Sequence, residues 1–166
     1  GASADGFSYE QLVQPILDRR CVACHQNNGV DSDKTRQSTF LLTSETDKSP
    51  ATGQTGGLRV FSQSYLNLTA KGQCTPLVNW VHARSFAPML PPYACGSTQS
   101  RLMDYFKPSH YGVQATDAER RVIACWIDLA VPFCGSYAQA NTWSEEERRL
   151  YNYHQTNRVA FAEQEM

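Results

Sequence analysis

The spacing of apolar residues along the chain predicts a molecule built from helices. Near the start, apolar residues recur at the period of one face of an α-helix, at Tyr9, Leu12, Val13, Ile16 and Leu17. No strand ladder is evident, apart from a possible short strand at Leu58–Phe61. We expect helices at Ser8–Arg20, Ser62–Leu68, Thr75–Ala83, Ser97–Phe106, Thr116–Leu129 and, last, from Thr142 or Ser144 through Phe161.

Polar residues and a proline mark two of these helices. Thr116 and Glu119 have the spacing of a capping box, in which each side chain bonds the backbone of the other residue. Ser8 and Gln11 have the same spacing at the start of the first helix. Pro15 cannot give a backbone hydrogen bond, so we expect it to kink that helix.

A long polar segment separates the first two helices. From Gln26 to about Gly57 the chain is rich in Ser, Thr, Asp and Gly and has no hydrophobic period. Loops of this length are either disordered or functional. An apolar trio, Phe40, Leu41 and Leu42, interrupts the polar run. We expect this trio to tether the loop to the body.

Length and composition fit one globular domain with an appendage. The chain has 166 residues, of which 41% are hydrophobic and 19% charged. We expect an all-α domain over 1–135 and a C-terminal helical extension over 136–166 that packs on it. The net charge of -1 gives no basic footprint for nucleic acid. No apolar run approaches the roughly 18 residues of a membrane span, so no membrane insertion is expected.

The most specific chemical signal is the pentad Cys21-Val22-Ala23-Cys24-His25. Two thiols at this spacing, followed at once by an imidazole, are the attachment signature of a c-type haem. Cys21 and Cys24 form thioethers with the haem in that signature, and His25 is the proximal iron ligand. The alternatives are a zinc knuckle, which needs two further ligands, and a thioredoxin-like dithiol, which accompanies a βαβ pattern. We therefore expect one covalent haem c.

The other cysteines bear on the cellular compartment. Four remain, an even number that allows three pairings into disulfides. The most local pairing joins Cys74 to Cys95 and Cys125 to Cys134, while four reduced, buried thiols are the alternative. Covalent haem and disulfides both belong outside the reducing cytosol, so the expected location is periplasmic or exported.

The second axial ligand of the iron separates carriers from catalysts. Two strong ligands saturate the iron and favour electron transfer, whereas an open face admits a substrate. His110 follows Pro108 in a loop beside Gly112, which leaves its backbone free to aim the ring inward. The remaining candidates are His82, Met89, Met103 and His154. Three arginines are candidates for pairing with haem propionates, although each also fits an ordinary surface position: Arg59, Arg84 and Arg101.

Several further motifs carry a family resemblance. Val13-Gln14-Pro15-Ile16-Leu17, the haem pentad, Ser100-x-Leu102 and Trp126-Ile127-Asp128 resemble the monohaem cytochrome c domains of planctomycete-type proteins. In those domains a distal Met lies between the S-x-L and W-I-D helices. This chain has Ser109-His110-Tyr111-Gly112-Val113 there instead.

The chain from about Pro88 onward resembles another haem domain more closely. His110-Tyr111-x-Val113, Trp126-Ile127-Asp128 and Pro132-Phe133-Cys134-Gly135-Ser136-Tyr137 are similar to the C-terminal haem domain of the hydrazine synthase alpha subunit. That resemblance implies a cytochrome c-like fold, a six-coordinate, bis-histidine haem c and His110 as the distal iron ligand. His82 and Met89 are the fallbacks for that position.

These observations favour one-electron transfer to and from a redox protein or a neighbouring domain, rather than an enzyme. The first alternative is a haem enzyme or small-gas-binding module with an open distal site. A second is the electron-delivery module of a larger multidomain oxidoreductase, which the start at Gly1 without an initiator Met suggests. The sequence does not define the oligomeric state.

Overall fold

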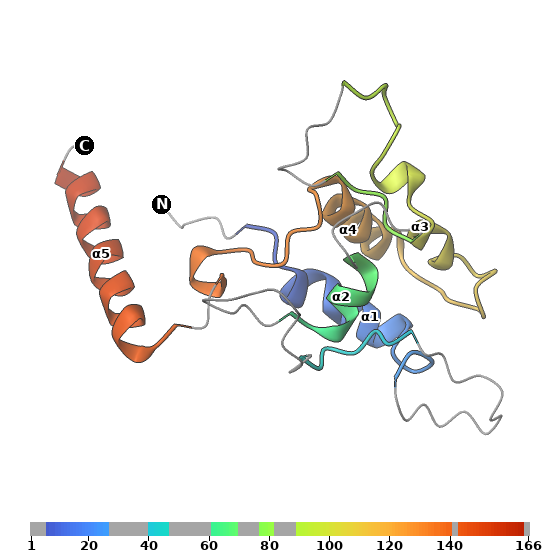
Figure 1. Cartoon of the computed structure of the whole chain (residues 1–166), viewed down its shortest axis with the longest axis horizontal. Helices are drawn as coiled ribbons and strands as arrows, with labels where there is room; N and C mark the ends of the chain where they lie inside the picture. The colour runs from blue at the N-terminus through green and yellow to red at the C-terminus, as the bar shows by residue number, and fades with distance from the viewer. Residues whose placement is uncertain are drawn as a thin grey trace.

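Helices dominate the described part of the molecule. The computed structural model describes residues 6–26, 40–46, 61–69, 77–81, 89–140 and 143–164. Within these ranges the only extended pairing is an isolated antiparallel bridge between Thr46 and Ser62. Phe61 lies in no strand, and the rest of the possible strand at Leu58–Phe61 lies outside the described residues. The all-α class is confirmed (Figure 1).

The order of elements follows the expected order of helices. The second, fifth and last helices lie within one to three residues of their expected starts, whereas the fourth is divided in two. The elements are η1 (Tyr9–Val13), α1 (Gln14–Arg20), α2 (Gln63–Thr69), η3 (Ser97–Gln99), α3 (Leu102–Tyr105), α4 (Asp117–Asp128), η4 (Tyr137–Gln139) and α5 (Glu145–Gln164).

The first helix changes type instead of beginning with a capping box. Its first turn, η1, is a π-helix, and Pro15 lies in the first turn of α1, where its missing N–H is tolerated. The predicted box of Ser8 and Gln11 is wrong, because the Ser8 side chain makes no capping bond. The Ser8 hydroxyl is instead buried, with no hydrogen-bond partner among the described residues.

The predicted helix at Thr75–Ala83 is wrong over its described residues, 77–81. The carbonyl of Leu77 accepts a bond from the N–H of Leu102 at 2.8 Å, and that of Asn79 from the N–H of Gly96 at 2.9 Å. These carbonyls bond to a distant segment and not to the next helical turn. Ser100 joins the same contact, since its hydroxyl accepts from the N–H of Asn79 at 2.8 Å. Ser100 also separates η3 from α3.

The core forms where η1, α1 and α2 meet α4. Tyr9 and Trp126 are fully buried, with ring centres 5.1 Å apart, and Tyr65 lies 5.1 Å from Tyr9. Each polar tip has an acceptor: the Tyr9 hydroxyl donates to Ser64 Oγ at 3.0 Å, and Trp126 Nε1 donates to the Pro132 carbonyl at 3.1 Å. Burial raises the pKa of Tyr9, so its hydroxyl stays protonated. Trp126 therefore has the packing role expected for it.

Helix α4 is capped at both ends. The capping box of Thr116 and Glu119 is confirmed. At the other end Ala130 adopts a left-handed φ of 61°, its N–H bonds Ile127, and the N–H of Val131 bonds the carbonyl of Trp126. These two bonds form a Schellman motif without the usual glycine. The motif turns the chain toward Phe133, which completes the core.

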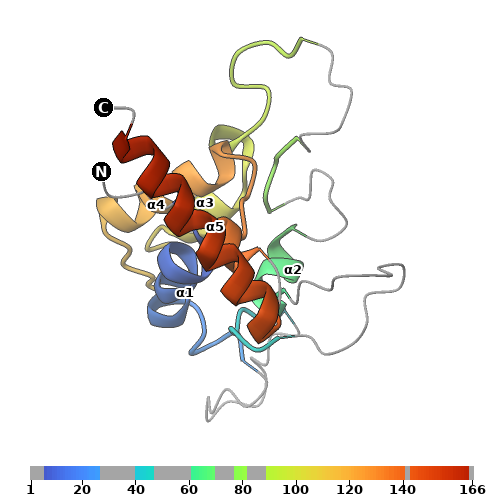
Figure 2. The ribbon, with the colours of Figure 1, turned by 90° about the vertical axis from the view of Figure 1, so that its left-hand side faces the viewer.

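The C-terminal extension stands apart from the body, in contrast to the packing expected of it. No residue of α5 is buried; the helix lies to one side of the body in Figure 1 and in front of it in Figure 2. Contact at its base comes from rings: Trp143 lies 5.4 Å from Tyr137 and 5.6 Å from Tyr151. The rest of α5 is too polar to form a core-facing stripe. Within the described residues, no helix combines the length and apolar character needed to cross a membrane.

Candidate haem site

The pentad begins where α1 ends. The N–H groups of Cys21 and Val22 both bond the carbonyl of Leu17, at 2.7 and 3.0 Å. The N–H of Cys24 then bonds the Cys21 carbonyl at 3.1 Å, and that of His25 bonds it at 3.0 Å. The pentad is thus a tight turn continuous with the helix. These hydrogen bonds hold the pentad backbone without any contribution from a cofactor.

The two thiols of the pentad have different surroundings. Cys21 packs against the core, whereas Cys24 is exposed. Burial, followed by the nearby Cys24, raises the pKa of Cys21 to about 11. The Cys21 thiol is therefore protonated at neutral pH. Both sulfur atoms lie on one turn, as a group attached through two thioethers requires.

His25 is oriented by the apolar trio that interrupts the polar segment. Its Nδ1 lies 2.8 Å from the Phe40 carbonyl, and the His25 carbonyl accepts the N–H of Leu42 at 2.9 Å. Because a carbonyl can only accept, Nδ1 carries the proton and Nε2 keeps its lone pair. Phe40 packs against the core and Leu42 is buried, so the predicted tether is confirmed for both residues.

His110 lies on a compact turn after α3. The N–H of His110 bonds the Lys107 carbonyl at 3.0 Å, and the N–H of Gly112 bonds the Pro108 carbonyl at 3.0 Å. Tyr111 and Gly112 both have left-handed φ values, 48° and 77°. Backbone strain of this kind is common at ligand clamps. The turn brings the half-buried His110 ring toward the pentad.

The central observation is that His25 and His110 face each other. Their ring centres are 6.4 Å apart, and their planes differ by only 24°. Imidazoles that share one metal ion through bonds of about 2.0 Å each should place their ring centres roughly 6.3 Å apart. The separation is compatible with one metal ion held between the two rings. His25, with Nε2 free, and His110 are the residues that would hold a haem iron.

The electrostatics of His110 favour the neutral imidazole, the form that binds a metal ion. Burial lowers its pKa, and the nearby His25 lowers it further. Within the described residues the His110 ring makes no hydrogen bond; it lies against the rings of Tyr105 at 4.8 Å and Tyr111 at 5.1 Å. Both nitrogens of the ring are accordingly uncommitted to protein partners.

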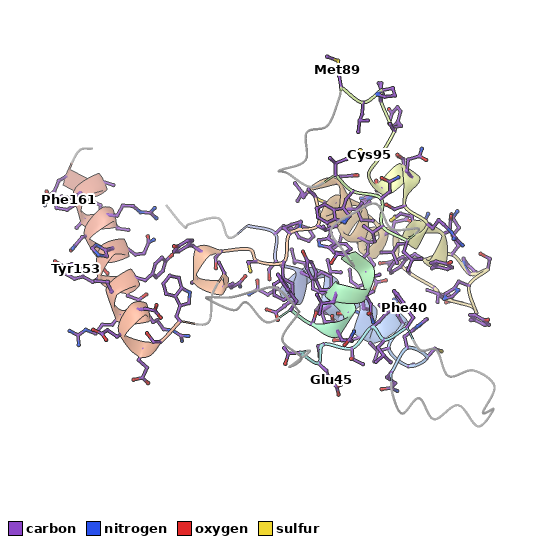
Figure 3. All side chains as sticks on the ribbon, in the orientation of Figure 1. Phe40, Glu45, Met89, Cys95, Tyr153 and Phe161 are labelled. Atoms are coloured by element: carbon purple, nitrogen blue, oxygen red, sulfur yellow. The ribbon has the colours of Figure 1, made fainter. Side chains whose placement is uncertain are left out.

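The described candidates Met89 and His154 do not lie beside the pentad. Met89 is fully exposed, and Figure 3 places it at the outer end of its loop, well away from Phe40 beside the pentad. Met103 packs against the core, and His154 lies on α5. His82 lies outside the described residues, as do Cys74, Arg59 and Arg84.

The described cysteines form no disulfide. No disulfide joins Cys95, Cys125 or Cys134 to another described cysteine, and the Cys134 thiol donates to the Gln139 carbonyl at 3.2 Å. The pairing of Cys125 with Cys134 is therefore not formed, and the partner expected for Cys95 lies outside the described residues. Within those residues, His, Cys, Asp and Glu side chains do not gather into any group of three that could hold a metal ion.

A buried carboxylate supports the helix that leads into the pentad. Glu119 accepts from Arg19 Nη2 at 3.3 Å and from Arg20 Nη2 at 3.1 Å, as well as from Thr116. Burial opposes ionisation of Glu119, but the Thr116 backbone, Arg20 and Arg19 together lower its pKa to about 2. The capping-box spacing indicated the bond to Thr116. No sequence signal indicated the arginine pair or the Phe40 carbonyl.

The comparisons with known proteins give no match: neither a family model, nor a curated protein, nor a solved structure corresponds to this chain.

Proposed function

We propose that this chain is a c-type cytochrome that carries one covalent haem and transfers single electrons between redox partners. The observation that carries the proposal is the facing pair of His25 and His110, with ring centres 6.4 Å apart directly beside a C-x-x-C-H turn. The spacing of the pentad supports haem attachment, and the facing rings support a six-coordinate iron. A saturated iron favours electron transfer over substrate activation.

Each residue has a defined role in this proposal. Cys21 and Cys24 hold the cofactor covalently, His25 presents Nε2 to one face of the iron, and His110 binds the opposite face. The haem, when bound, supplies a centre that gains and loses one electron. The Phe40 carbonyl keeps the proton of His25 on Nδ1. A hydrogen bond of this kind orients a metal-binding imidazole and raises its basicity.

The proposed redox properties and location follow from the same site. Bis-histidine ligation gives a lower reduction potential than His/Met ligation, because Met raises the potential. A periplasmic or exported location is proposed from the compartments in which haem c is attached, since no disulfide joins the described cysteines. The partner is a second redox protein or a neighbouring domain. A transient electron-transfer encounter needs only a small interface.

The test is to produce the full chain in a host with a haem c maturation system. We expect a coloured protein that stains for haem on a denaturing gel and whose intact mass equals polypeptide plus one haem. The ferric and ferrous spectra should be low-spin, and carbon monoxide should not shift the ferrous bands promptly. A colourless protein would overturn the proposal, and a prompt shift with carbon monoxide would overturn saturated ligation.

His110→Ala identifies the second ligand. We expect this variant to keep its covalent haem but to become high-spin and to bind carbon monoxide. His154→Ala, on the exposed helix α5, is the matched control and should keep the low-spin spectrum. If His110→Ala also stays low-spin, a residue other than His110 binds the iron, and Met89→Ala and His82→Ala are the next variants to measure.

A further inference from the structure

Tyr105 holds a position next to His110 that the proposed function does not yet explain. It is the last residue of α3, and its half-buried ring lies 4.8 Å from the His110 ring at an angle of 60°. One helical turn earlier, Arg101 Nη2 donates to the Tyr105 hydroxyl at 3.3 Å. The Tyr105 ring is therefore fixed at both ends, by its helix and by a side chain of the same helix.

His110 needs such a neighbour, because no hydrogen bond to a described residue orients its ring. Among the described residues, the ring contacts of His110 are with Tyr105, Tyr111 and His25. Tyr111 is part of the strained turn, with a left-handed φ of 48°. Unlike Tyr111, Tyr105 belongs to helix α3 and not to the turn that carries His110. Its position does not depend on the strained backbone.

We propose that Tyr105 is a positioning residue that sets the ring plane of His110 nearly parallel to that of His25, and that Arg101 orients Tyr105 for this purpose. This inference rests on the proposed function, since it concerns the distal ligand of the same haem. The supporting geometry is the 24° angle between the two imidazole planes, with the Tyr105 ring in contact with His110 alone of the two histidines.

Ring planes have a measurable electronic consequence. When two axial imidazoles lie nearly parallel, their π orbitals act on the same d orbital of a low-spin ferric iron and separate it from its neighbour in energy. Electron paramagnetic resonance then gives a rhombic spectrum with three resolved g values. Nearly perpendicular planes leave the two d orbitals close in energy and give one dominant, large g value. The observed angle therefore predicts a rhombic spectrum.

The experiment compares the ferric holoprotein with Tyr105→Leu and Tyr105→Phe. Tyr105→Leu removes the ring contact, so we expect its largest g value to move upward and carbon monoxide to bind the ferrous form about tenfold faster, equivalent to about 1.4 kcal/mol. Tyr105→Phe keeps the ring but loses the hydroxyl that Arg101 bonds, so its largest g value should move upward less than in Tyr105→Leu, as in Arg101→Met. Tyr93→Leu is the matched control, because Tyr93 is exposed on the loop before η3.

Arg101→Met tests the same arrangement from an exposed position, where loss of folding is not expected. It should give a smaller upward shift of the largest g value than Tyr105→Leu. A Tyr105→Leu protein with the g values and carbon monoxide rate of the wild type would overturn the role of Tyr105. An unchanged Arg101→Met spectrum would overturn the role of Arg101.

The outcome also separates this inference from the proposed function. A wild-type spectrum that is low-spin but shows one dominant g value keeps bis-histidine ligation and overturns the parallel planes. A high-spin wild type overturns the ligation itself, and the positioning role with it. Far-ultraviolet circular dichroism of each variant establishes that the helices remain intact.

Discussion

His25 and His110 face each other, yet the chain holds them by different means. His25 follows a helix without interruption, and its Nδ1 is fixed by a hydrogen bond of 2.8 Å to the Phe40 carbonyl. His110 sits on a strained turn, and within the described residues its ring contacts other rings and makes no hydrogen bond. A hydrogen bond restricts both direction and protonation, whereas ring contacts restrict mainly the plane. The proximal side is thus the more rigid of the two.

This difference separates two kinds of sequence information. The proximal side depends on residues adjacent in sequence, so a local motif can specify it. The surroundings of His110 depend on residues that are brought together by folding, so no short motif can specify them. Variants that affect one side and leave the other intact test the distinction.

The largest effect is expected on the proximal side. Replacing both Cys21 and Cys24 with Ala should abolish covalent haem attachment, because no other described thiol lies on the pentad turn. Haem staining of a denaturing gel measures this directly. Cys125→Ala, at an exposed position on α4, is the control and should stain fully. Haem staining of the double variant at the control level would contradict the assignment of the thioethers.

The tether of His25 provides the second test. Leu42 is 5% exposed and its N–H bonds the His25 carbonyl, so Leu42→Ala should lower the free energy of unfolding by about 2–5 kcal/mol. The expected cause is a cavity beside the segment that orients His25. Denaturant titration measures it. Leu150→Ala on α5, where the side chain is 56% exposed, should change stability by less than about 0.5 kcal/mol.

Glu119→Gln removes the carboxylate charge that pairs with Arg19 and Arg20 of α1. It should lower the free energy of unfolding by about 1–3 kcal/mol at neutral pH. The pKa of Glu119 falls from 4.5 to about 2 on folding, so the stabilising contribution is complete above pH 4.5. This contribution is lost as the pH falls through 2, because Glu119 is then protonated in both the folded and the unfolded protein. The difference in the free energy of unfolding between wild type and Glu119→Gln should therefore decrease as the pH falls from 4.5 to 2.

Asp117→Asn is the matched control for Glu119→Gln, because Asp117 also lies in the first turn of α4 but is exposed, 4.0 Å from Arg120. It should change the free energy of unfolding by less than about 0.5 kcal/mol at any pH. Equal pH profiles for both variants would contradict the role of the buried carboxylate.

The smallest effect is expected on the distal turn. Gly112 has a φ of 77° and open space around the position of a Cβ, so Gly112→Ala should cost about 1 kcal/mol through backbone strain alone. Thermal unfolding measures the cost. The visible spectrum should stay low-spin, since the His110 ring keeps its neighbours. A loss of low-spin character would show that the turn, and not Tyr105, sets the ring.

Local patterns predicted the elements whose determinants lie within them. The box of Thr116 and Glu119 and the apolar face of α4 are complete in one segment, so that helix was predicted with its cap. The conformation of segment 77–81 was not predicted, because its carbonyls accept hydrogen bonds from the N–H groups of Gly96 and Leu102, which are distant in sequence. Likewise, Ala130 adopts a left-handed backbone conformation that is usually occupied by glycine, so the turn there could not be predicted from residue type.

The candidate site divides in the same way. The motif of five consecutive residues predicted Cys21, Cys24 and His25 as residues of the candidate site. His110 was implied by a family resemblance, and its ring does lie opposite that of His25. Neither the Phe40 carbonyl nor the Tyr105 ring could be predicted, since a backbone acceptor leaves no trace in residue type and an aromatic residue on a short helix is common.

The backbone contact between Gly6 and Gly135 determines where the outer helix is rooted. The Gly6 N–H donates to the Gly135 carbonyl at 2.6 Å, and a methyl group on either glycine would lie 2.5 Å from the other carbonyl oxygen. The linker to α5 leaves the body from this crossing, and the side chains of α5 stay outside the core. A tag on α5 would therefore attach the protein to an electrode without disturbing buried side chains, an arrangement suited to voltammetry of immobilised molecules.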